Sequence, residues 1–385
     1  MKPIRVLIPD GEQWEAVKVI RCLDPKDGFR PFVLSARRDA PARCSSYCYR
    51  FLTLGALGST DRRSAVLEAI DRFSIDVVLP VTYAGTEFVA ANRDILSGVV
   101  HPAPVVPLDA LKATNNKWLF CRMADDLSLP VPRTALLVRE REPRPDGVAL
   151  AGVAFPALVK PTVGGGGGGI VRVDNSDALD VLLRQRWGKS PPTQDYMIQE
   201  FLGGVDLCLG AFCLDGDIIA YTLQRSLLSS SRPFGPQRAM DFIDDASILE
   251  TGATLLKALN WRGVAYVDFR VDQRDGRAKL LEMNPRFGQA VLGSLAAGVN
   301  FPLLACRSAL GLSLPPQIYR PIRFIHPMAH LKLLARALTW RGDGTRFSWR
   351  ESGLRFTARD PLPEIVFALA SCRNRPRRTP SPACI

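Results

Sequence analysis

Short apolar runs alternate with helix-spaced segments along the first hundred residues. The predicted strands are residues 5–9, 32–35 and 76–80, and the predicted helices are residues 15–23 and 64–73. Strands that alternate with helices in this way favour a parallel α/β sheet. The sequence HPAPVVP at residues 101–107 breaks the regularity. We therefore predict a first α/β domain over residues 1–112.

The rest of the chain predicts smaller mixed units. Strands are predicted at residues 155–160, 170–173 and 196–201, helices at residues 113–127 and 177–186, and strands joined by Asp-Gly turns over most of residues 206–223 and 263–284. Residues 139–152, rich in Arg, Glu, Pro and Gly, predict a loop. A basic amphipathic segment covers residues 328–338, with irregular sequence after it. We expect the tail RNRPRRTPSPACI to be disordered.

Composition places the chain among ordinary globular proteins. Hydrophobic residues make up 47% and charged residues 23% of the 385 residues, and no run of eighteen apolar residues occurs. The N-terminus predicts a strand rather than a secretory signal. Nine cysteines without a CxxC pair, and three histidines without an acidic partner between them, indicate reduced thiols in a cytoplasmic protein and no zinc site.

The net charge of +12 is concentrated at one end. Residues 320–385 hold 13 basic and four acidic residues, a net charge of +9, which leaves the body at +3. This basic end could contact an anionic membrane or an acidic partner, or it could simply aid solubility. No aromatic-rich basic motif accompanies it, so we expect no specific nucleic acid. The sequence does not fix the oligomeric state, for which a dimer is one option.

Six consecutive glycines lie between two predicted strands, with Lys160 at the end of the strand before them. Glycine N–H groups can approach an anion without a Cβ in the way. A dinucleotide-binding turn or a P-loop would need a helix after the glycines, and a strand follows here. A flexible linker is a further alternative, although the flanking strands favour a hairpin-like loop. The glycines are Gly164, Gly165, Gly166, Gly167, Gly168 and Gly169.

An acidic hairpin is predicted around the turn at residues 274–276. With a three-residue loop, facing positions sum to 550, so Asp268 lies opposite Glu282, and Asn284 shares their face. Odd positions in both strands are apolar, so this face carries three oxygen ligands of the kind that magnesium prefers. Arg286 follows directly and would add a cation for phosphoryl transfer. The alternative is a half-buried hairpin with an ordinary solvated face.

These motifs resemble the ATP-grasp superfamily, especially its carboxylate–amine ligases, carbamoyl-phosphate synthases and biotin carboxylases. The similarity runs over roughly residues 1–310 and is most specific in LEMNPR at residues 281–286 with Asp268 before it. It implies α/β and α+β units in an ATP-grasp fold. The implied parts are a pre-ATP-grasp parallel α/β domain at 1–112, subdomain A with a glycine flap at 113–202, subdomain B with the metal hairpin at 203–312, and a basic C-terminal extension at 313–385.

The resemblance also implies roles for particular residues. Lys117 and Lys160 would contact phosphates beneath the glycine flap, and Arg286 would steady the transferred phosphate. The hinge Glu200, Phe201 and Leu202 would meet adenine through its backbone, and Asp206 would bind ribose. Asp268, Glu282 and Asn284 would hold the metal. Family members often have glutamate or glutamine where Asp268 stands, which leaves open whether one or two metal ions bind.

We therefore expect a ligase that uses ATP and Mg²⁺, with Mn²⁺ as an alternative ion. It would convert a small-molecule carboxylate to an acyl phosphate for attack by an amine. Other ATP-grasp chemistry remains open, namely phosphorylation of a hydroxyl or use of a thiol or ammonia as acceptor. A non-catalytic nucleotide-binding protein is the remaining alternative.

Overall fold

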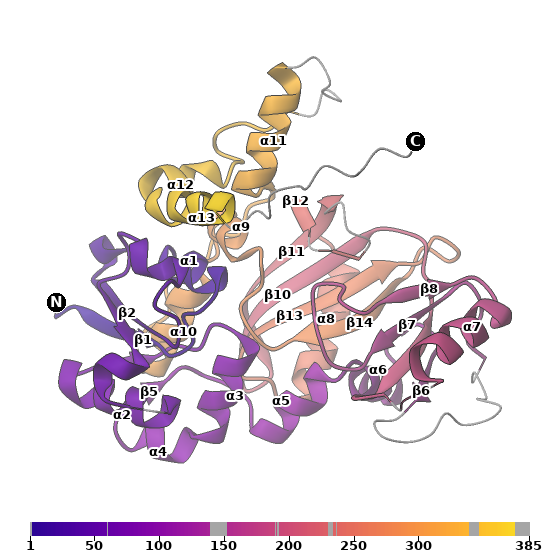
Figure 1. Cartoon of the computed structure of the whole chain (residues 1–385), viewed down its shortest axis with the longest axis horizontal. Coiled ribbons are helices and arrows are strands. Elements are labelled where there is room, and N and C mark those ends of the chain that lie inside the picture. The colour runs from indigo at the N-terminus through magenta and orange to yellow at the C-terminus, as the bar shows by residue number, and fades with distance from the viewer. Residues whose placement is uncertain are drawn as a thin grey trace, which may run out of the picture.

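The computed structural model describes residues 2–59, 61–138, 152–188, 190, 192–229, 234–235, 237–338 and 346–373. Three β-sheets form its frame, and Figure 1 shows them in a row: the N-terminal unit at one end, the longest strands in the middle and a small sheet at the other end. The predicted loop at 139–152 and the predicted disordered tail lie almost wholly outside the described residues.

The N-terminal sheet is parallel throughout, as the alternating pattern predicts. Its strand order is β3-β2-β1-β4-β5. The elements are β1 (Ile4–Ile8), α1 (Trp14–Ile20), η1 (Pro25–Asp27), β2 (Phe29–Ser35), η2 (Pro41–Cys44), β3 (Arg50–Thr53), η3 (Leu54–Leu57), α2 (Arg62–Phe73), β4 (Val77–Val78), α3 (Tyr83–Ala91), α4 (Arg93–Ser97) and β5 (His101–Pro102). Val6, Leu7 and Ile8 of the central strand are fully buried, as expected for a sheet covered on both faces.

The helix predicted at residues 113–127 is wrong, because two helices meet there. α5 (Leu108–Asn115) ends at Asn116, whose backbone is extended, and α6 (Lys117–Asp126) begins directly after it. The Asn116 side chain accepts hydrogen bonds from Trp118 N and Leu119 N, which satisfies donors that the first turn of α6 leaves free. This cap places Lys117 at the first position of a helix.

The small sheet is antiparallel and has the order β6-β9-β7-β8. Its strands are β6 (Thr134–Val138), β7 (Ala157–Pro161), β8 (Val171–Val173) and β9 (Tyr196–Glu200), and α7 (Ser176–Trp187) follows β8. β7 and β8 pair with each other on either side of the glycine run. The prediction of a hairpin-like loop there, rather than a linker, is confirmed.

The central sheet has six antiparallel strands in the order β14-β13-β10-β11-β12-β15. They are β10 (Asp206–Leu214), β11 (Asp217–Ser229), β12 (Gln237–Ile243), β13 (Gly263–Val271), β14 (Ala278–Asn284) and β15 (Arg323–Ile325), and α8 (Ala246–Ala258) lies between β12 and β13. The predicted Asp-Gly turn between β10 and β11 is present, with positive φ at both Asp215 and Gly216.

Five helices follow β14 among the described residues, and the last of them packs against the N-terminal unit. They are α9 (Val291–Ala296), α10 (Phe301–Ala309), α11 (Pro327–Leu338), α12 (Leu354–Arg359) and α13 (Leu362–Arg373). The prediction of irregular sequence after residue 338 is therefore wrong for α12 and α13. The pattern of α13 is apolar nearly all round, so it lacks the amphipathic period that marks a surface helix.

A buried ion cluster joins the C-terminal helices to the N-terminal unit. Arg21, at the end of α1, contacts Asp360 at 3.0 Å and Glu364 at 2.8 Å, and the side chains of Arg21 and Asp360 are 3% and 1% exposed. Ser45 and Ser46 add hydrogen bonds to the Asp360 carboxylate. The chain therefore closes on itself, with α13 beside α1 and η2 (Figure 1).

Candidate active site

The hairpin of β13 and β14 brings the three predicted oxygen ligands together. Asp268 faces Glu282 across the pair, and Asn284 faces Tyr266. Asn284 Nδ2 donates to Asp268 Oδ2 at 3.0 Å and to Glu282 Oε1 at 3.3 Å. Since these two pairs keep the predicted register, Asp268, Glu282 and Asn284 share one face of the sheet.

The predicted register is wrong beyond Asp268, where a β-bulge intervenes. Phe269 pairs with Leu280, one position short of the expected Leu281. The loop has four residues rather than the predicted three, because Asp272 N donates to Arg277 O and encloses residues 273–276. The extra residue of the bulge lets Leu280 and Met283 both be buried while Glu282 stays beside Asp268.

Two buried lysines face this cluster. Lys117 Nζ lies 3.1 Å from Glu282 Oε2 and donates to Gly164 O at 2.5 Å. Lys160 Nζ donates to Gln199 Oε1 at 2.7 Å. The two lysines are only 7% and 5% exposed, so their charges point into the protein rather than into bulk water.

Burial and mutual charge shift the pKa values of these groups. Burial, with the neighbouring Glu282 charge, raises the pKa of Asp268. Burial would also raise the pKa of Glu282, but Lys117 and Lys160 outweigh it and lower that pKa. The pKa of Lys160 is lowered, mainly by burial. Two crowded carboxylates beside two desolvated lysines suit a site that receives both a cation and an anion.

The glycine loop lies over this face of the hairpin. Gly164, Gly166, Gly167 and Gly169 have positive φ, which residues with a Cβ rarely adopt. A Cβ on Gly165 would lie 4.0 Å from Arg286 Nη2, and one on Gly167 would lie 2.4 Å from Phe234 O. The loop is thus held between Lys117, Arg286 and Phe234.

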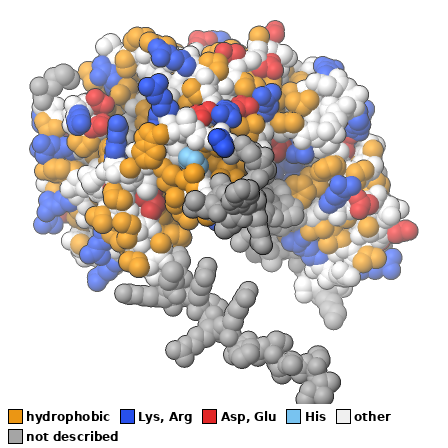
Figure 2. Space-filling view, turned by 90° about the horizontal axis from the view of Figure 1, so that it is seen from above, with side chains coloured by type: hydrophobic (Ala, Val, Ile, Leu, Met, Phe, Trp, Pro, Cys, Tyr) orange, Lys and Arg blue, Asp and Glu red, His pale blue; other side chains and the backbone are white. Residues whose placement is uncertain are grey.

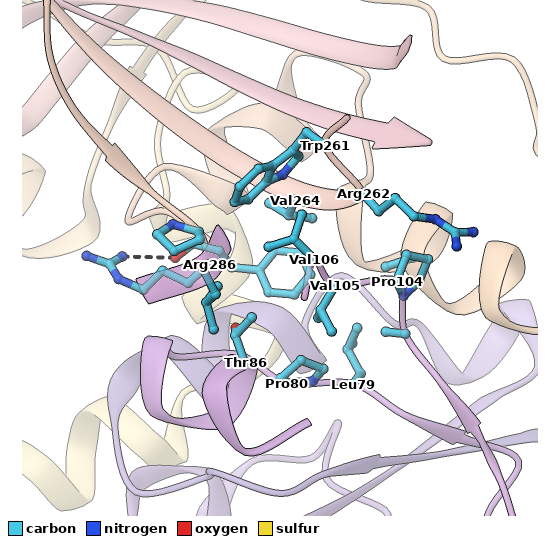
Figure 3. A pocket seen from close by; sticks show the side chains of 15 residues that line it. Leu79, Pro80, Thr86, Pro104, Val105, Val106, Trp261, Arg262, Val264 and Arg286 are labelled. Atoms are coloured by element: carbon cyan, nitrogen blue, oxygen red, sulfur yellow. Dashed lines mark hydrogen bonds between the residues drawn. The ribbon is translucent and has the colours of Figure 1, made fainter. Parts of the chain in front are cut away.

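Arg286 adds a third cation beside the oxygen ligands. Its Nη2 donates to Asn284 Oδ1 at 3.0 Å, and its Nη1 donates to Phe287 O at 3.1 Å. Figure 3 shows Arg286 extending away from a small pocket lined mainly by apolar side chains such as Leu79, Val105 and Trp261. Neither Asp268 nor Glu282 lines that pocket, which borders the site only through Arg286 and its neighbours Pro285 and Phe287.

The side chains of the predicted nucleotide hinge are engaged with the protein. Glu200 accepts from Arg133 N at 3.0 Å and pairs with Arg274 at 2.9 Å. The Phe201 ring lies under the Arg172 guanidinium, 4.7 Å from ring centre to Cζ. Part of the main chain is engaged as well, since Glu200 N donates to Arg133 O, Phe201 N donates to Pro156 O, and Leu202 O accepts from Arg270 Nε.

Asp206, the predicted ribose ligand, forms an ion pair with Arg270 at 2.5 Å. The Asp206 side chain is 38% exposed. A ribose hydroxyl would therefore share this carboxylate with Arg270.

The structure adds residues near the site that the sequence analysis did not identify. Gln199 holds Lys160 and also donates to Thr134 Oγ1 at 2.9 Å. Lys18 of α1 donates to both the side chain and the main chain of Gln289, which in turn contacts Glu15. Lys18 and Gln289 are 271 positions apart, so no local pattern could have joined them.

Two features are absent from the residues that the structure describes. None of the helices there is long and apolar enough to cross a membrane. Nor does that part of the chain gather three His, Cys, Asp or Glu side chains in a metal-binding arrangement. The hairpin site has two carboxylates and one amide instead.

Comparison with known proteins finds one matching family model and several solved structures with a similar fold. Residues 192–329 match the family model described as "ATP-grasp in the biosynthetic pathway with Ter operon". The carbamoyl phosphate synthase large chain of Acidobacterium capsulatum is 26% identical over 220 residues, which is 54% of this chain and 20% of that protein. This chain therefore spans about a fifth of that curated relative.

Solved structures resemble nearly the whole chain. N5-carboxyaminoimidazole synthetase from Staphylococcus aureus, in complex with ADP, superposes with a TM-score of 0.67 at 17% identity and covers 88% of this chain and 87% of its own. Biotin carboxylase from Campylobacter jejuni gives 0.61 at 17% identity, with 81% and 72% covered. L-amino acid ligase from Bacillus licheniformis gives 0.58 at 17% identity, with 80% and 74% covered.

Proposed function

We propose that the chain is an ATP-dependent ligase of the ATP-grasp superfamily, a family model of which matches residues 192–329. It activates a carboxylate as an acyl phosphate and passes the acyl group to an amine, with release of ADP and phosphate. One observation supports this most: Lys117, Lys160 and Arg286 converge on the oxygen-bearing face of the hairpin beneath the glycine loop. Cations placed around a transferred phosphoryl group offset its charge.

The residues of the hairpin fit one or two magnesium ions, or manganese in their place. Asp268, Glu282 and Asn284 offer hard oxygen atoms. Burial and the neighbouring Glu282 charge raise the pKa of Asp268, and a bound cation would relieve this unfavourable environment for the carboxylate. The Asn284 amide would have to turn, because its Nδ2 now faces both carboxylates. When bound, the metal would neutralise charge on the nucleotide phosphates.

The chain's own groups perform the remaining tasks. Lys117 would exchange part of its contact with Glu282, and Lys160 part of its contact with Gln199, for contact with phosphate oxygens. Arg286 would hold the phosphoryl group as it moves to the acid. The glycine loop would cover the acyl phosphate and exclude water, which otherwise hydrolyses it. The main chain of Glu200 to Leu202 would meet the adenine.

We place the acid on the side of Arg286 that faces α1. Lys18 lies within electrostatic reach of Arg286, and burial lowers the pKa of Lys18 to about 8. Two cations with one nearby acid, Glu15, suit a negatively charged substrate. An amine bound beside the acyl phosphate would then attack its carbonyl carbon, and phosphate would leave.

The test is turnover of MgATP by the purified protein with a panel of acids and amines. We expect ADP release that requires both an acid and an amine, and transfer of ¹⁸O from the labelled carboxylate into phosphate. Glu282→Gln should lower turnover by at least about a hundredfold, because it removes a charge that faces the metal and Lys117.

Glu250→Gln, on the exposed side of α8, is the matched control and should leave turnover unchanged. Phosphate free of ¹⁸O together with a phosphorylated alcohol would replace the ligase with a kinase. Nucleotide binding without turnover, equal in wild type and Glu282→Gln, would contradict catalysis altogether.

A further inference from the structure

Exposed apolar side chains gather on the C-terminal helices. Of the 22 large hydrophobic side chains exposed among the described residues, nine lie between positions 328 and 369. Single exposed apolar residues are common on any protein, but a cluster of this kind marks a contact surface. The nine are Met328, Leu331, Leu334, Trp349, Leu362, Ile365, Val366, Phe367 and Leu369. We call this group, without Phe367, whose ring contacts Trp14, the C-terminal apolar surface.

The outer face of α13 forms the most regular part of this surface. Leu362, Ile365, Val366 and Leu369 follow the spacing i, i+3, i+4, i+7 that places them on one side of a helix, and they are 46–59% exposed. The opposite side already has partners, since Glu364 pairs with Arg21 and the Phe367 ring contacts Trp14. A helix that is apolar on both sides normally has both sides covered.

α11 continues the same pattern on a neighbouring helix. Met328, Leu331 and Leu334 are 46–59% exposed, whereas Ala329 and His330 are buried against the protein. Lys332 is exposed among the apolar residues. In Figure 1, α11 projects from the body above α12 and α13, and Figure 2 looks down onto this face, where hydrophobic side chains lie among Lys and Arg side chains.

The charges around the surface have one sign. Lys332, Arg346, Arg350 and Arg359 are exposed. The acids described in the same region have basic partners: Glu351 contacts Arg323 at 2.8 Å, and Asp360 and Glu364 contact Arg21. The region therefore presents positive charge next to apolar side chains, and Trp349, 58% exposed, adds an aromatic ring of the kind that favours a membrane interface.

We propose that the C-terminal apolar surface docks on an anionic lipid bilayer. α11 and α13 have 12 residues each, too short to span a membrane, but a suitable length to lie in its interface with apolar residues inserted and basic residues at the headgroups. A second copy of the chain would fit less well, because it would bring the same unbalanced Arg and Lys charges together. The proposal does not depend on the ligase activity.

Flotation of the full chain with vesicles tests the proposal. We expect binding to vesicles that contain phosphatidylglycerol, weak or no binding to vesicles of phosphatidylcholine alone, and weaker binding at high salt. The double variant I365D/L369D should bind anionic vesicles roughly ten-fold or more weakly. The double variant I95D/V99D, which alters two similarly exposed apolar residues of the N-terminal unit, should bind as wild type does.

Two further measurements keep the test decisive if I365D/L369D is poorly folded. Tryptophan emission should shift to the blue with anionic vesicles, and Trp349→Phe should remove most of the shift. Lys332→Glu with Arg350→Glu should weaken binding, since both side chains are exposed. No flotation with anionic vesicles would overturn the proposal. So would a dimer that I365D/L369D dissociates, or binding to an acidic protein without binding to lipid.

Discussion

At the scale of single residues, the oxygen cluster of the site could be predicted, but its surroundings could not. Asp268, Glu282 and Asn284 lie within 17 positions, and a strand's period of two places them on one face. The contact between Lys18 and Gln289 depends instead on how α1 packs beside the loop after β14. Local periodicity carries no information about such a contact.

Lys18→Met should raise the KM for the acid substrate roughly ten-fold and change the KM for ATP little. The ammonium lies near Arg286 rather than among the phosphate-facing lysines, so its loss weakens binding of the acid in particular. Steady-state kinetics with each substrate varied in turn would measure both constants. A rise in the KM for ATP alone would show that Lys18 serves the nucleotide.

Lys26→Met is the matched control for this substitution. Lys26 is exposed in η1 and lines a separate surface pocket with Asp24 and Arg359. It should leave both KM values unchanged.

At the scale of elements, most strands and helices follow from the sequence pattern, and the exceptions have physical reasons. The break between α5 and α6 has a local signal, because Asn116 is a favoured cap residue. The bulge in the hairpin has none, since it results from packing Leu280 and Met283 together. α13 was missed because apolar residues surround it nearly completely.

The glycine flap allows a paired test of fit. Gly166 and Gly167 both have positive φ, at 65° and 75°, but only a Cβ on Gly167 would meet another group, Phe234 O at 2.4 Å. Alanine at either position should cost about 1 kcal/mol of backbone strain. Gly167→Ala should in addition displace the flap and lower kcat/KM for ATP roughly ten-fold below that of Gly166→Ala. Equal kinetics in the two variants would show that the contact with Phe234 does not position the flap.

The ion cluster that holds α13 should contribute strongly to stability. Asp360→Ala removes one of the two carboxylates that pair with the buried Arg21 guanidinium and leaves it Glu364 and the main-chain carbonyl of residue 360. We therefore expect the free energy of unfolding to fall by about 3 kcal/mol. Urea unfolding followed by circular dichroism would measure the loss. Asp39→Ala, in an exposed pair with Arg37, is the control and should change stability little. A similar small effect at Asp360 would mean that water replaces the lost carboxylate.

At the scale of the whole molecule, the parallel sheet and the ATP-grasp fold could be predicted from strand order and motifs. The return of the C-terminal helices to the N-terminal unit could not, because Arg21 and Asp360 are 339 positions apart. One large core cluster, which includes Val6 of β1, Phe212 of β10 and Phe301 of α10, joins the N-terminal unit to the central sheet.

Folding should depend on pH through His326, which lies directly after β15. Burial, with the nearby Lys18 charge, lowers the pKa of His326 from 6.5 to about 3. As the pH falls below 6.5, His326 becomes protonated in the unfolded chain but stays neutral in the folded chain. The free energy of unfolding therefore falls. Between about pH 7 and pH 5 this residue should account for a loss of up to about 2 kcal/mol.

Urea unfolding of wild type and His326→Gln at both pH values would isolate this contribution. The variant should lose less stability than wild type on acidification. His101→Gln, at an exposed histidine, should behave as wild type does. Parallel losses in all three proteins would assign the acid sensitivity to other groups.

Helix α1 is only seven residues long, yet it reaches two distant parts of the protein. Trp14 contacts Phe367 of α13, and the capping residue Arg21 pairs with Asp360 just before it. Glu15 contacts Gln289, and Lys18 lies near Arg286. A displacement of α1 at its contacts with the C-terminal helices would therefore also move the residues that face Gln289 and Arg286. Thermodynamic linkage then makes the effect reciprocal. If bilayer binding raised the affinity for substrate by some factor, substrate binding would raise the affinity for the bilayer by the same factor.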